Sequence, residues 1–534
     1  MKYKLIGTGN IDNPIETILA NRGITEDLFL VGKEVVEDFS HYDNVREGIE
    51  MLLKHLDNND LILLIPDVDV DGITSFTILY NYLLNIYPQA RLTYKMHSGK
   101  QHGMEDIVVD DEVKLVIVPD AGTQDYEIHK QLKDRRIDVL VLDHHIGKEY
   151  SKDAVVINNQ LSEKVQNKEL SGAGVCYKFI QELDEYLGES FASQYQDLNA
   201  LGNVADMMDL HSLETRYYVY EGLKKTNNTF LQALKDVKSY DLDGKYNIGK
   251  LGWTIAPIIN GTIRSGTLKE KEDMLKAFLS DDYDFCVKVA KACVNAKSRQ
   301  DKAVKKAMTT DYSDIEVEDN QRVMIVDSGK LNNNHSGLVA NKLIKLYGRN
   351  VLMCRDKKNG KVGGSFRGNE NITDNFFKDI EDSGIATVLG GHEQAGGWEC
   401  DKDKLDNFVT YLEKLYEGKR IVLDNEYEVD FVLDIEELDQ IFVDEIAEYE
   451  DEWGNKIEKP LVAVQNIVLD EEDIFIGKNF VRFIANGITF VKNYASKVFK
   501  ESMVGDIECD VIGSCVINSY DGIGQIEIED IEIN

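Results

Sequence analysis

Pro66-Asp67-Val68-Asp69-Val70-Asp71-Gly72 and Leu142-Asp143-His144-His145 carry more information than any other segments of this chain. Each follows a short run rich in isoleucine, leucine and valine, which is typical of a buried strand. Each therefore places carboxylate and imidazole groups at the carboxyl end of a strand. In α/β sheets this is the end where binding sites form.

A predicted strand followed by a polar residue and a helical pattern occurs three times in the first part of the chain. Residues 61–65, 115–118 and 139–142 are predicted strands, and a polar side chain and a helical pattern follow each of them. This repetition predicts an α/β fold with a parallel, doubly wound sheet. A second α/β pattern starts at residue 323, and from about residue 422 alternating runs predict a β-rich domain of the OB type.

These patterns divide the chain into five predicted parts. They are an N-terminal lead-in (1–60) that is helical from residue 26, an α/β domain (61–270), a connecting helix (271–315), a smaller α/β domain (316–418) and an OB-like domain (419–534). A helix is also expected over residues 172–187, ahead of the segment that contains Asp206.

Composition limits the class of protein. The chain has 534 residues, of which 43% are hydrophobic, so it can form several domains with real cores. No run of 18 apolar residues occurs and the start lacks a secretory signal, so we expect a cytoplasmic protein without a membrane segment. The seven cysteines are scattered and never form a C-x-x-C pair, which argues against disulfides and thiolate zinc sites.

The net charge of −36 restricts contact with nucleic acid, because a protein that grips a long track of phosphates normally has a basic surface. Any such grip must be local. One candidate is the run from Lys288 to Lys306, which is expected to be helical and concentrates positive charge. An exposed connecting helix with solvated lysines explains the same run equally well.

The polar residues that follow the strands suggest a metal site. The set supplies four carboxylates and one imidazole, a mixture that suits Mn²⁺ or Mg²⁺, and consists of Asp67, Asp69, Asp120, His144 and Asp206. Two such ions about 3.5–4 Å apart would activate water for attack on phosphorus. Taken singly, an Asp-x-Asp pair can cap a helix, and Asp206 can be a structural hydrogen-bond acceptor.

The chain resembles the DHH phosphoesterase superfamily in four motifs. They are Asp-Val-Asp-Val-Asp-Gly (67–72), Pro-Asp-Ala-Gly (119–122), Asp-His-His (143–145) and Val-Ala-Asp-Met (204–207). Further matches, including Leu-Ser-Gly-Ala-Gly-Val (170–175) and the glycine motif at 390–397, are similar to the RecJ branch of single-strand-specific exonucleases. The resemblance covers nearly the whole chain and implies a DHH core followed by a DHHA1 domain.

The resemblance implies specific roles in the core. One metal would be bound by Asp69, Asp120, His144 and Asp206, and Asp67 with the shared Asp120 would bind the other. His145 would face the scissile phosphate, and Asp143 would orient the paired histidines. Asp71 is expected to shape the turn.

The resemblance also implies a substrate site in the DHHA1 domain. Ser365, Arg367 and His392 would contact the substrate, and Gly390 and Gly391 would let backbone amides approach a phosphate. His335 and Arg264 are further phosphate-contact candidates, for which a capping or surface role is the alternative.

The expected function is a metal-dependent phosphodiesterase that hydrolyses single-stranded DNA, 5′ to 3′ by family likeness, to 5′-mononucleotides. A hydrolase of short oligonucleotides or cyclic dinucleotides is the first alternative, since a small basic pocket would suffice for it. A non-catalytic replication scaffold is the second. Leu63 replaces a histidine found in several DHH branches, which weakens one expected metal site. The acidic C-terminal domain is expected to dock a basic protein partner.

Overall fold

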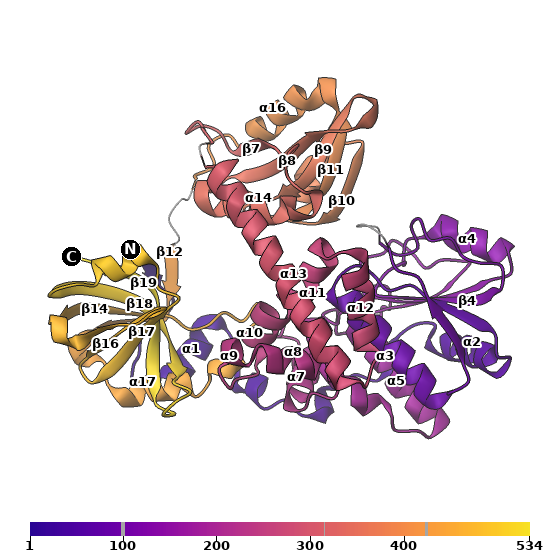
Figure 1. The fold of residues 1–534 in the computed structure, drawn as a ribbon, viewed down its shortest axis with the longest axis horizontal. Helices are drawn as coiled ribbons and strands as arrows, with labels where there is room; N and C mark the ends of the chain where they lie inside the picture. Colours follow the sequence, from indigo (N-terminus) through magenta and orange to yellow (C-terminus); the bar gives the residue numbers. More distant parts are fainter. Residues whose placement is uncertain (98–101, 314, 422–425) are drawn as a thin grey trace. The chain divides into compact units, whose positions relative to one another are not determined.

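A parallel sheet carries the two motifs, as the sequence predicts (Figure 1). Within the described residues it has the strand order β3-β2-β4-β5-β6. The strands are β2 (Leu61–Leu64), β3 (Arg91–Tyr94), β4 (Val113–Pro119), β5 (Asp138–Asp143) and β6 (Val155–Asn158). The chain pairs β3 with one side of β2 and then crosses to place β4 on its other side. The boundary between β2 and β4 is thus the topological switch point, where such sheets bind ligands.

Both faces of this sheet are buried, which confirms the doubly wound prediction. Leu64 and Ile117 belong to one buried cluster, whereas Leu63 and Val116 belong to another. Because successive side chains of a strand point to opposite faces, the two clusters lie on opposite sides of the sheet. The helices of this region are α2 (Val45–Asp57), α3 (Val70–Ile86), α4 (Tyr126–Asp134) and α5 (Gly172–Leu187).

The structure is a computed structural model that describes residues 1–97, 102–313, 315–421 and 426–534. The chain separates into two units, the first formed mainly by residues 3–294 and 427–534 and the second by residues 295–426. The five-part division stays a prediction. Within the described parts of the chain, every helix is too short or too polar to cross a lipid bilayer. All seven cysteines are buried free thiols.

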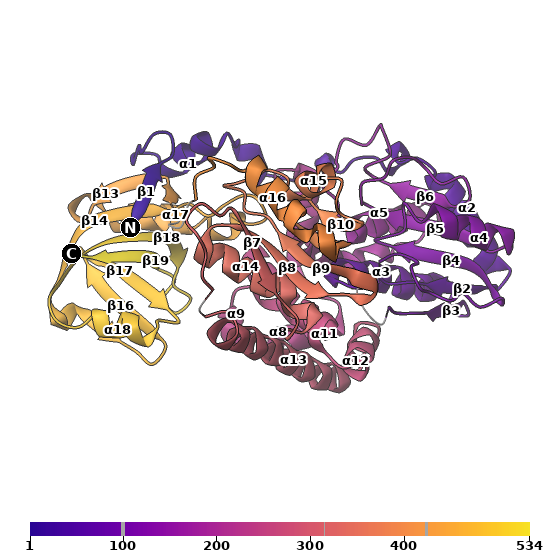
Figure 2. The same cartoon turned by 90° about the horizontal axis from the view of Figure 1, so that it is seen from above.

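A helical region follows the sheet in the first unit. Its elements are α6 (Gln196–Ala205), α7 (Leu213–Lys224), α8 (Thr229–Val237), α9 (Ser239–Leu242), α10 (Ile248–Lys250), the π-helix η5 (Leu251–Ile255), α11 (Ala256–Ser265) and α12 (Leu268–Phe278). The helix α13 (Tyr283–Thr310) begins in the first unit and continues into the second. Figure 2 shows α8, α11 and α12 close to α13.

The N-terminal segment differs from the prediction. Helix was expected from residue 26 to residue 60, but only α2 is α-helical there. The residues before it form three 3-10 turns, namely η1 (Glu26–Phe29), η2 (Lys33–Val35) and η3 (Phe39–His41). The side chain of Asp38 accepts a hydrogen bond from the Ser40 amide, a local contact that competes with a continuous helix. The elements β1 (Lys2–Leu5) and α1 (Pro14–Arg22) were not predicted.

The C-terminal part is β-rich, as predicted, and belongs to the first unit. Its described residues form a mostly antiparallel seven-stranded sheet of order β13-β14-β18-β19-β17-β16-β15. The elements are β12 (Glu426–Val429), β13 (Phe431–Asp434), β14 (Val462–Leu469), β15 (Ile474–Ile476), β16 (Phe480–Ala485), β17 (Ile488–Asn493), β18 (Ile507–Ile517), β19 (Gly524–Ile533), α17 (Gln440–Ala447) and α18 (Lys497–Ser502). Its core joins that of the helical region that follows the parallel sheet, since Val464 and Val204 share one buried cluster.

The second unit contains the smaller α/β domain that was predicted. Its described strands have the order β10-β11-β9-β8-β7, in which only β7 and β8 are parallel. The elements are β7 (Val323–Asp327), α14 (Ser336–Tyr347), β8 (Asn350–Asp356), β9 (Lys361–Arg367), α15 (Phe376–Asp382), β10 (Val388–His392), β11 (Ala395–Asp401) and α16 (Leu405–Leu415).

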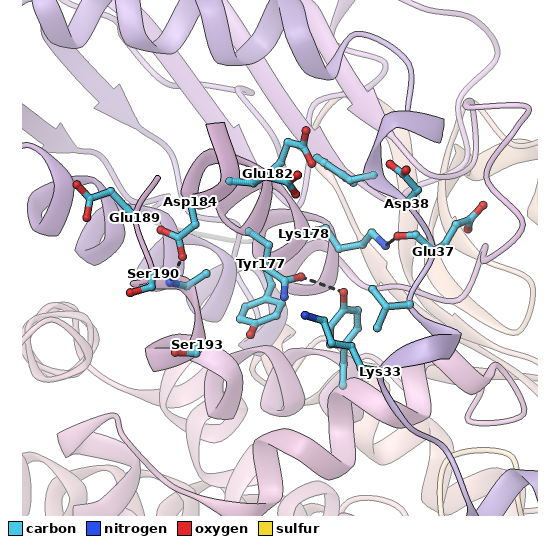
Figure 3. A pocket seen from close by; sticks show the side chains of 16 residues that line it. Lys33, Glu37, Asp38, Tyr177, Lys178, Glu182, Asp184, Glu189, Ser190 and Ser193 are labelled. Carbon is cyan, nitrogen blue, oxygen red and sulfur yellow. Dashed lines mark hydrogen bonds between the residues drawn. The ribbon is translucent and has the colours of Figure 1, made fainter. Parts of the chain in front are cut away.

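A buried ion pair connects the N-terminal segment to α5 and α7. Lys178 Nζ donates to the Glu37 carbonyl at 2.6 Å and pairs with Glu214, and both charged side chains are almost fully buried. Glu214 also accepts hydrogen bonds from the Glu37 amide and from Asn167 Nδ2. The pair lies at a cavity of 590 Å³, and Figure 3 shows Lys178 directed toward Glu37. Because Lys178 is fully engaged in these contacts, we read the pair as structural.

We predict that Lys178→Met lowers the free energy of unfolding by about 3–5 kcal/mol, because it leaves the Glu214 carboxylate buried without its counter-ion. The double variant Lys178→Met/Glu214→Gln should recover much of this loss, since neither charge then remains. Urea denaturation measures both effects. Lys33→Met, at an exposed position of the same cavity, is the control and should change stability by less than about 0.5 kcal/mol. Equal losses in Lys178→Met and Lys33→Met would contradict the prediction.

Candidate metal centre

The predicted ligands meet at the switch point of the parallel sheet. Asp67 follows β2, Asp120 follows β4 and His144 follows β5, so the three come from the carboxyl ends of neighbouring strands. Asp120 has a backbone φ of 65°, which is uncommon for a residue with a side chain. Such backbone strain persists where the surrounding structure holds the residue, often at functional sites.

His144 lies at the centre of a group of carboxylates. Its Nε2 atom is 3.2 Å from Asp120 Oδ1 and 3.4 Å from Asp206 Oδ2. The same atom is 3.8 Å from Oδ2 of Asp71. Potential ligand atoms also converge in a second group, formed by Asp67, Asp69 and Asp120. Asp120 belongs both to this group and to a group with His144 and His145, as expected for a residue shared between two ions.

The donor atoms fit a hard divalent cation. Asp67 Oδ1 and Asp120 Oδ1 are buried, and neither accepts a hydrogen bond from any residue that the structure describes. A buried carboxylate oxygen without a donor is costly, so its lone pairs call for a partner. Carboxylate oxygens with one imidazole are the ligands that Mn²⁺ and Mg²⁺ accept. We conclude that Asp67, Asp69, Asp120, His144 and Asp206 can hold such ions.

Two glycines make room for these carboxylates. A Cβ atom on Gly172, at the start of α5, would lie 2.3 Å from Asp120 Oδ1 and 2.4 Å from Asp120 Cβ. A Cβ atom on Gly72 would lie 2.6 Å from Asp67 Cβ. Both positions therefore require glycine for the close approach of a ligand.

Asp69 combines capping with its predicted role as a ligand. It is the N-cap of α3, and its Oδ1 accepts a hydrogen bond from the Gly72 amide at 2.9 Å. The capping role that the sequence left as an alternative is thus real. It engages one oxygen and leaves the other for the metal group, so the two roles coexist.

Asp71 does more than the sequence suggested. It was expected only to shape the turn, but its buried carboxylate accepts hydrogen bonds from the α5 N-terminus, namely from Ser171 Oγ (2.8 Å), Gly172 N (2.7 Å) and Ala173 N (3.0 Å). It thereby ties the first turn of α3 to α5. It also shares a potential metal group with His144 and Asp206. In the sequence, only its position next to Asp67 and Asp69 indicated that Asp71 could belong to the site.

His145 is held by Asp143. The Asp143 Oδ1 atom lies 2.8 Å from His145 Nδ1 and accepts hydrogen bonds from the amides of both histidines. Its Oδ2 accepts from the Thr123 amide. Because Nδ1 is the ring atom engaged with Asp143, the ring orientation of His145 is set and Nε2 is left as its other polar atom.

Burial and mutual repulsion raise the pKa values of three aspartates of the cluster. Burial, together with the charges of Asp67 and Asp71, raises the pKa of Asp69 to about 6. Burial and then the charges of Asp71 and Asp69 raise the pKa of Asp206 to about 8. Burial, followed by the charge of Asp71, also raises the pKa of Asp120 well above its usual range.

In the Asp143–His145 pair, the pKa of Asp143 is lowered and the pKa of His145 is raised, so both shifts favour the charged forms. Burial would raise the pKa of Asp143, but the charge of His145 and its hydrogen bond hold that pKa well below the usual range. Burial would lower the pKa of His145, but Asp143 outweighs it and raises that pKa to about 10. Asp143 thus favours the protonated form of His145.

Two residues outside the predicted set support the site. His102 Nδ1 lies 2.9 Å from Asp67 Oδ2, although no pattern in the sequence marks this histidine. Asn455, from the C-terminal part, donates to the carbonyls of Asn203 and Val204 at 3.3 and 3.1 Å. These carbonyls close the helix that ends directly before Asp206. The C-terminal part thus braces one of the predicted ligands.

The second unit brings several of the predicted substrate residues together. Ser365 and Arg367 lie on β9, and Ser365 Oγ is 2.7 Å from Ser336 Oγ at the start of α14. The guanidinium of Arg367 covers Gly337, where a Cβ atom would lie 2.4 Å from its Nη2. His335 immediately precedes this helix and is buried. A cation and hydroxyls at the N-terminus of a 12-residue helix suit an anion.

Strand register relates the glycine motif to this group. Gly390 pairs with Gly397, which pairs with Ser365, and His392 pairs with Ala395, which pairs with Arg367. Gly391 occupies the position between Gly390 and His392. The side chain of His392 lies outside the part of the chain that the structure describes. Arg264 is exposed in the last turn of α11, in the first unit, so its phosphate contact stays a prediction.

The raised pKa values predict how stability depends on pH. Free aspartate titrates near 3.9, so the metal-free folded protein binds protons more tightly than the unfolded chain between about pH 4 and pH 8. Its free energy of unfolding should therefore fall as the pH rises through this window, and Mn²⁺ should remove the fall. Urea denaturation at a series of pH values, with chelator and with Mn²⁺, measures this. Asp206→Asn should flatten the metal-free curve between pH 6 and 8. A flat wild-type curve would refute the interpretation.

Gly172→Ala should lower Mn²⁺ affinity by at least about tenfold, because the new methyl group displaces Asp120 while every ligand remains in place. Isothermal titration calorimetry measures the change. Gly249→Ala is the matched control, since its Cβ atom would meet only Asn247 Oδ1 at 3.6 Å. Unchanged Mn²⁺ affinity in Gly172→Ala would show that Asp120 does not contribute a ligand at this position.

Comparison with known proteins places the chain in a family. Residues 61–203 match the DHH family, N-terminal domain. A Bacillus subtilis protein provisionally named as an SPbeta prophage-derived single-strand DNA-specific exonuclease is 33% identical over 569 aligned residues, which cover 100% of this chain and 98% of that protein. The RecJ exonuclease of the same organism is 24% identical over 541 aligned residues, covering 95% of this chain and 66% of its own length.

A solved structure has the same fold. The crystal structure of RecJ from Thermus thermophilus in complex with Mn²⁺ aligns with a TM-score of 0.75 at 18% identity, covering 99% of this chain and 79% of that one. The motifs, the fold and the relative that matches over the full length agree with one another. The chain belongs to the DHH family, in its branch of RecJ-type exonucleases.

Proposed function

We propose that this RecJ-type protein is a metal-dependent phosphodiesterase that degrades single-stranded DNA from its 5′ end to 5′-mononucleotides. The observation that carries the proposal is the meeting of His144 with Asp120 and Asp206 at the switch point, beside buried carboxylate oxygens that lack donors. The names of its relatives support single-stranded DNA as the substrate. The Mn²⁺-bound RecJ structure supports Mn²⁺, with Mg²⁺ as the alternative, as the cofactor.

The residues of the cluster would form two metal sites. Asp69, Asp120, His144 and Asp206 would hold one ion, and Asp67 with Asp120 would hold the other. Two divalent ions bound there would activate water for attack on phosphorus and neutralise the charge on the leaving oxygen. His145, oriented by Asp143, would donate a hydrogen bond from its protonated ring to a phosphate oxygen.

The anion-binding group of the second unit would position the substrate. Arg367 supplies a guanidinium that can bind a phosphate in a bidentate manner, and Ser365 supplies a hydroxyl. His335 and the backbone amides at Gly390 and Gly391 are further proposed contacts. A 5′-phosphate or an internal phosphate would satisfy the same donors.

A hydrolase of short oligonucleotides remains the second candidate. The acidic character of the chain, with 96 aspartates and glutamates against 60 lysines and arginines, favours a substrate with few phosphates. The compact group around Arg367 would suffice for such a substrate.

The basic protein partner and the cytoplasmic location stay proposals. Part of the acidic run of the C-terminal domain is already engaged, because Glu452 pairs with Arg216 and Glu450 pairs with Lys245. Glu445 on α17 and Glu448, the C-cap directly after this helix, are both exposed and three residues apart. We propose this face of α17 as the place where a basic segment would dock.

The test is Mn²⁺-dependent release of mononucleotides from a 5′-labelled long single strand, run beside a 5′-blocked strand and a dinucleotide. We expect rapid loss of label from the long strand, inhibition by the block, and a fall in kcat of at least about a thousandfold in His144→Ala, which loses a metal ligand without adding a charge. Circular dichroism checks that the variant is folded.

Each other result has a clear meaning. Turnover of the dinucleotide alone would assign the protein to the short-substrate class. Wild-type rates in folded His144→Ala, or in a metal-free protein, would overturn the metal mechanism. Degradation that starts at the 3′ end would leave the chemistry in place and reverse the polarity.

A further inference from the structure

The two carboxylate oxygens of Asp67 have different surroundings. Oδ1 is buried and accepts no hydrogen bond from any residue that the structure describes. Oδ2 lies 2.9 Å from Nδ1 of His102. Because an ionised carboxylate can only accept hydrogen bonds, Nδ1 carries the proton and donates it to Oδ2. One oxygen of Asp67 is thus held by His102, and the other is left for the metal group that Asp67 forms with Asp69 and Asp120.

Asp67 has no backbone anchor of the kind that its neighbours have. The Asp69 side chain accepts the Gly72 amide at 2.9 Å, and Asp71 accepts two amides at the start of α5. Within the described parts of the chain, His102 supplies the hydrogen bond that the Asp67 carboxylate receives. The orientation of this carboxylate therefore depends on one imidazole.

The turn that carries His102 is held in place by its own contacts. His97 is buried, and its Nε2 donates to the Gly103 carbonyl at 2.8 Å. Gly103 has a backbone φ of 60°, which favours glycine. The Met104 side chain is buried, and the Met104 amide donates to Asp125 Oδ2 at 2.9 Å. His102 is thus presented to Asp67 from a fixed piece of backbone, although its own side chain is exposed.

Asp125 holds this turn and does not cap its own helix. It is the N-cap residue of α4, but its side chain makes no capping hydrogen bond there. An aspartate at this position normally accepts an amide of the first helical turn. Its Oδ2 accepts the Met104 amide in place of that contact. A chance meeting of a surface histidine with Asp67 would not require an adjacent turn that is fixed in this way.

The ion beside Asp67 has few protein ligands to hold it. Leu63 lies on β2, four residues before Asp67, and its side chain is buried in an apolar cluster that includes Met104. This position therefore offers the ion no ligand. In the proposed arrangement Asp67 and Asp120 hold the ion, so a small rotation of either carboxylate would weaken its binding. Hydrogen bonds to ligating carboxylates prevent such rotations.

We propose that His102 is a positioning residue for the ion held by Asp67 and Asp120. Its Nδ1–H fixes Oδ2 of Asp67 and thereby keeps Oδ1 available to the metal. His102 acts through Asp67 and contacts neither the ion nor the DNA in this role. The proposal rests on the proposed function, because it adopts the two-ion site proposed there.

The test is Mn²⁺ binding to the metal-free protein without DNA, measured by isothermal titration calorimetry. Electron paramagnetic resonance detects the magnetic coupling between two neighbouring Mn²⁺ ions in the same samples. His102→Ala should weaken one of the two ions by about 10–100-fold and reduce the coupled signal, because Asp67 loses its donor. The affinity of the other ion should not change, which also shows that the variant is folded. Asp67→Asn identifies the affected ion, since it should weaken the same one.

Two further variants make the test specific. His102→Asn keeps an N–H donor near the position of Nδ1, so it should restore the binding that His102→Ala loses. His211→Ala is the matched control. His211 is also exposed and its Nδ1 lies 2.7 Å from Asp209 Oδ1, but neither residue belongs to a potential metal group among the described residues. This control should bind both ions as the wild type does.

The outcomes separate this proposal from the exonuclease. Wild-type Mn²⁺ binding in His102→Ala, or an equal loss in His102→Ala and His102→Asn, would overturn the positioning role and leave the exonuclease standing. A protein that shows the expected losses but hydrolyses no DNA would support the role of His102 and overturn the exonuclease alone. A wild type that binds only one ion would overturn both the positioning role and the two-ion mechanism.

Discussion

Repulsion between carboxylates is the constraint that shapes this protein. Asp71, Asp120 and Asp206 lie around His144, and Asp67 and Asp69 form a second group with Asp120. Burial and repulsion raise the pKa values of Asp69 and Asp206. The fold compensates with oriented backbone amides: Asp69 receives the amide of Gly72, and Asp71 receives the N-terminus of α5. A divalent metal ion bound there would complete the compensation, because it would supply positive charge to oxygens that lack donors.

Ion pairs also connect the C-terminal part to the helical region of the first unit. Glu450 and Glu452 pair with Lys245 and Arg216 of the helical region, so acids that look like a partner surface in the sequence partly serve as internal connections. Asn455 extends these connections to the helix that ends before Asp206. The segment from Glu450 to Asn455 therefore connects the C-terminal part to the helical region and to the end of α6, directly before Asp206.

Some elements were predictable and others were not, for physical reasons. The helix over residues 172–187 was predicted correctly, because it has a serine cap, a glycine after its last residue and a clear apolar face. The strand β3 was missed because its four residues, Arg-Leu-Thr-Tyr, lack the continuous apolar run that marks β2, which is equally short. The strand β6 was missed although it has such a run. The segment before α2 was wrongly expected to be helical, because local side-chain contacts such as that of Asp38 end each turn early. Asp71 and His102 were missed as members of the site because their contacts join distant segments.

The sequence by itself determined the chemistry of the site: the kinds of ligand, their positions after apolar strands, and the resemblance to DHH phosphoesterases. These follow from local patterns, which a chain displays without being folded. Only the tertiary structure decided which oxygens meet His144, that Asp71 bridges α3 and α5, and that Asn455 braces the Asp206 segment. Each of these depends on distances between side chains, which strand order and helix packing set and which spacing along the chain does not reveal.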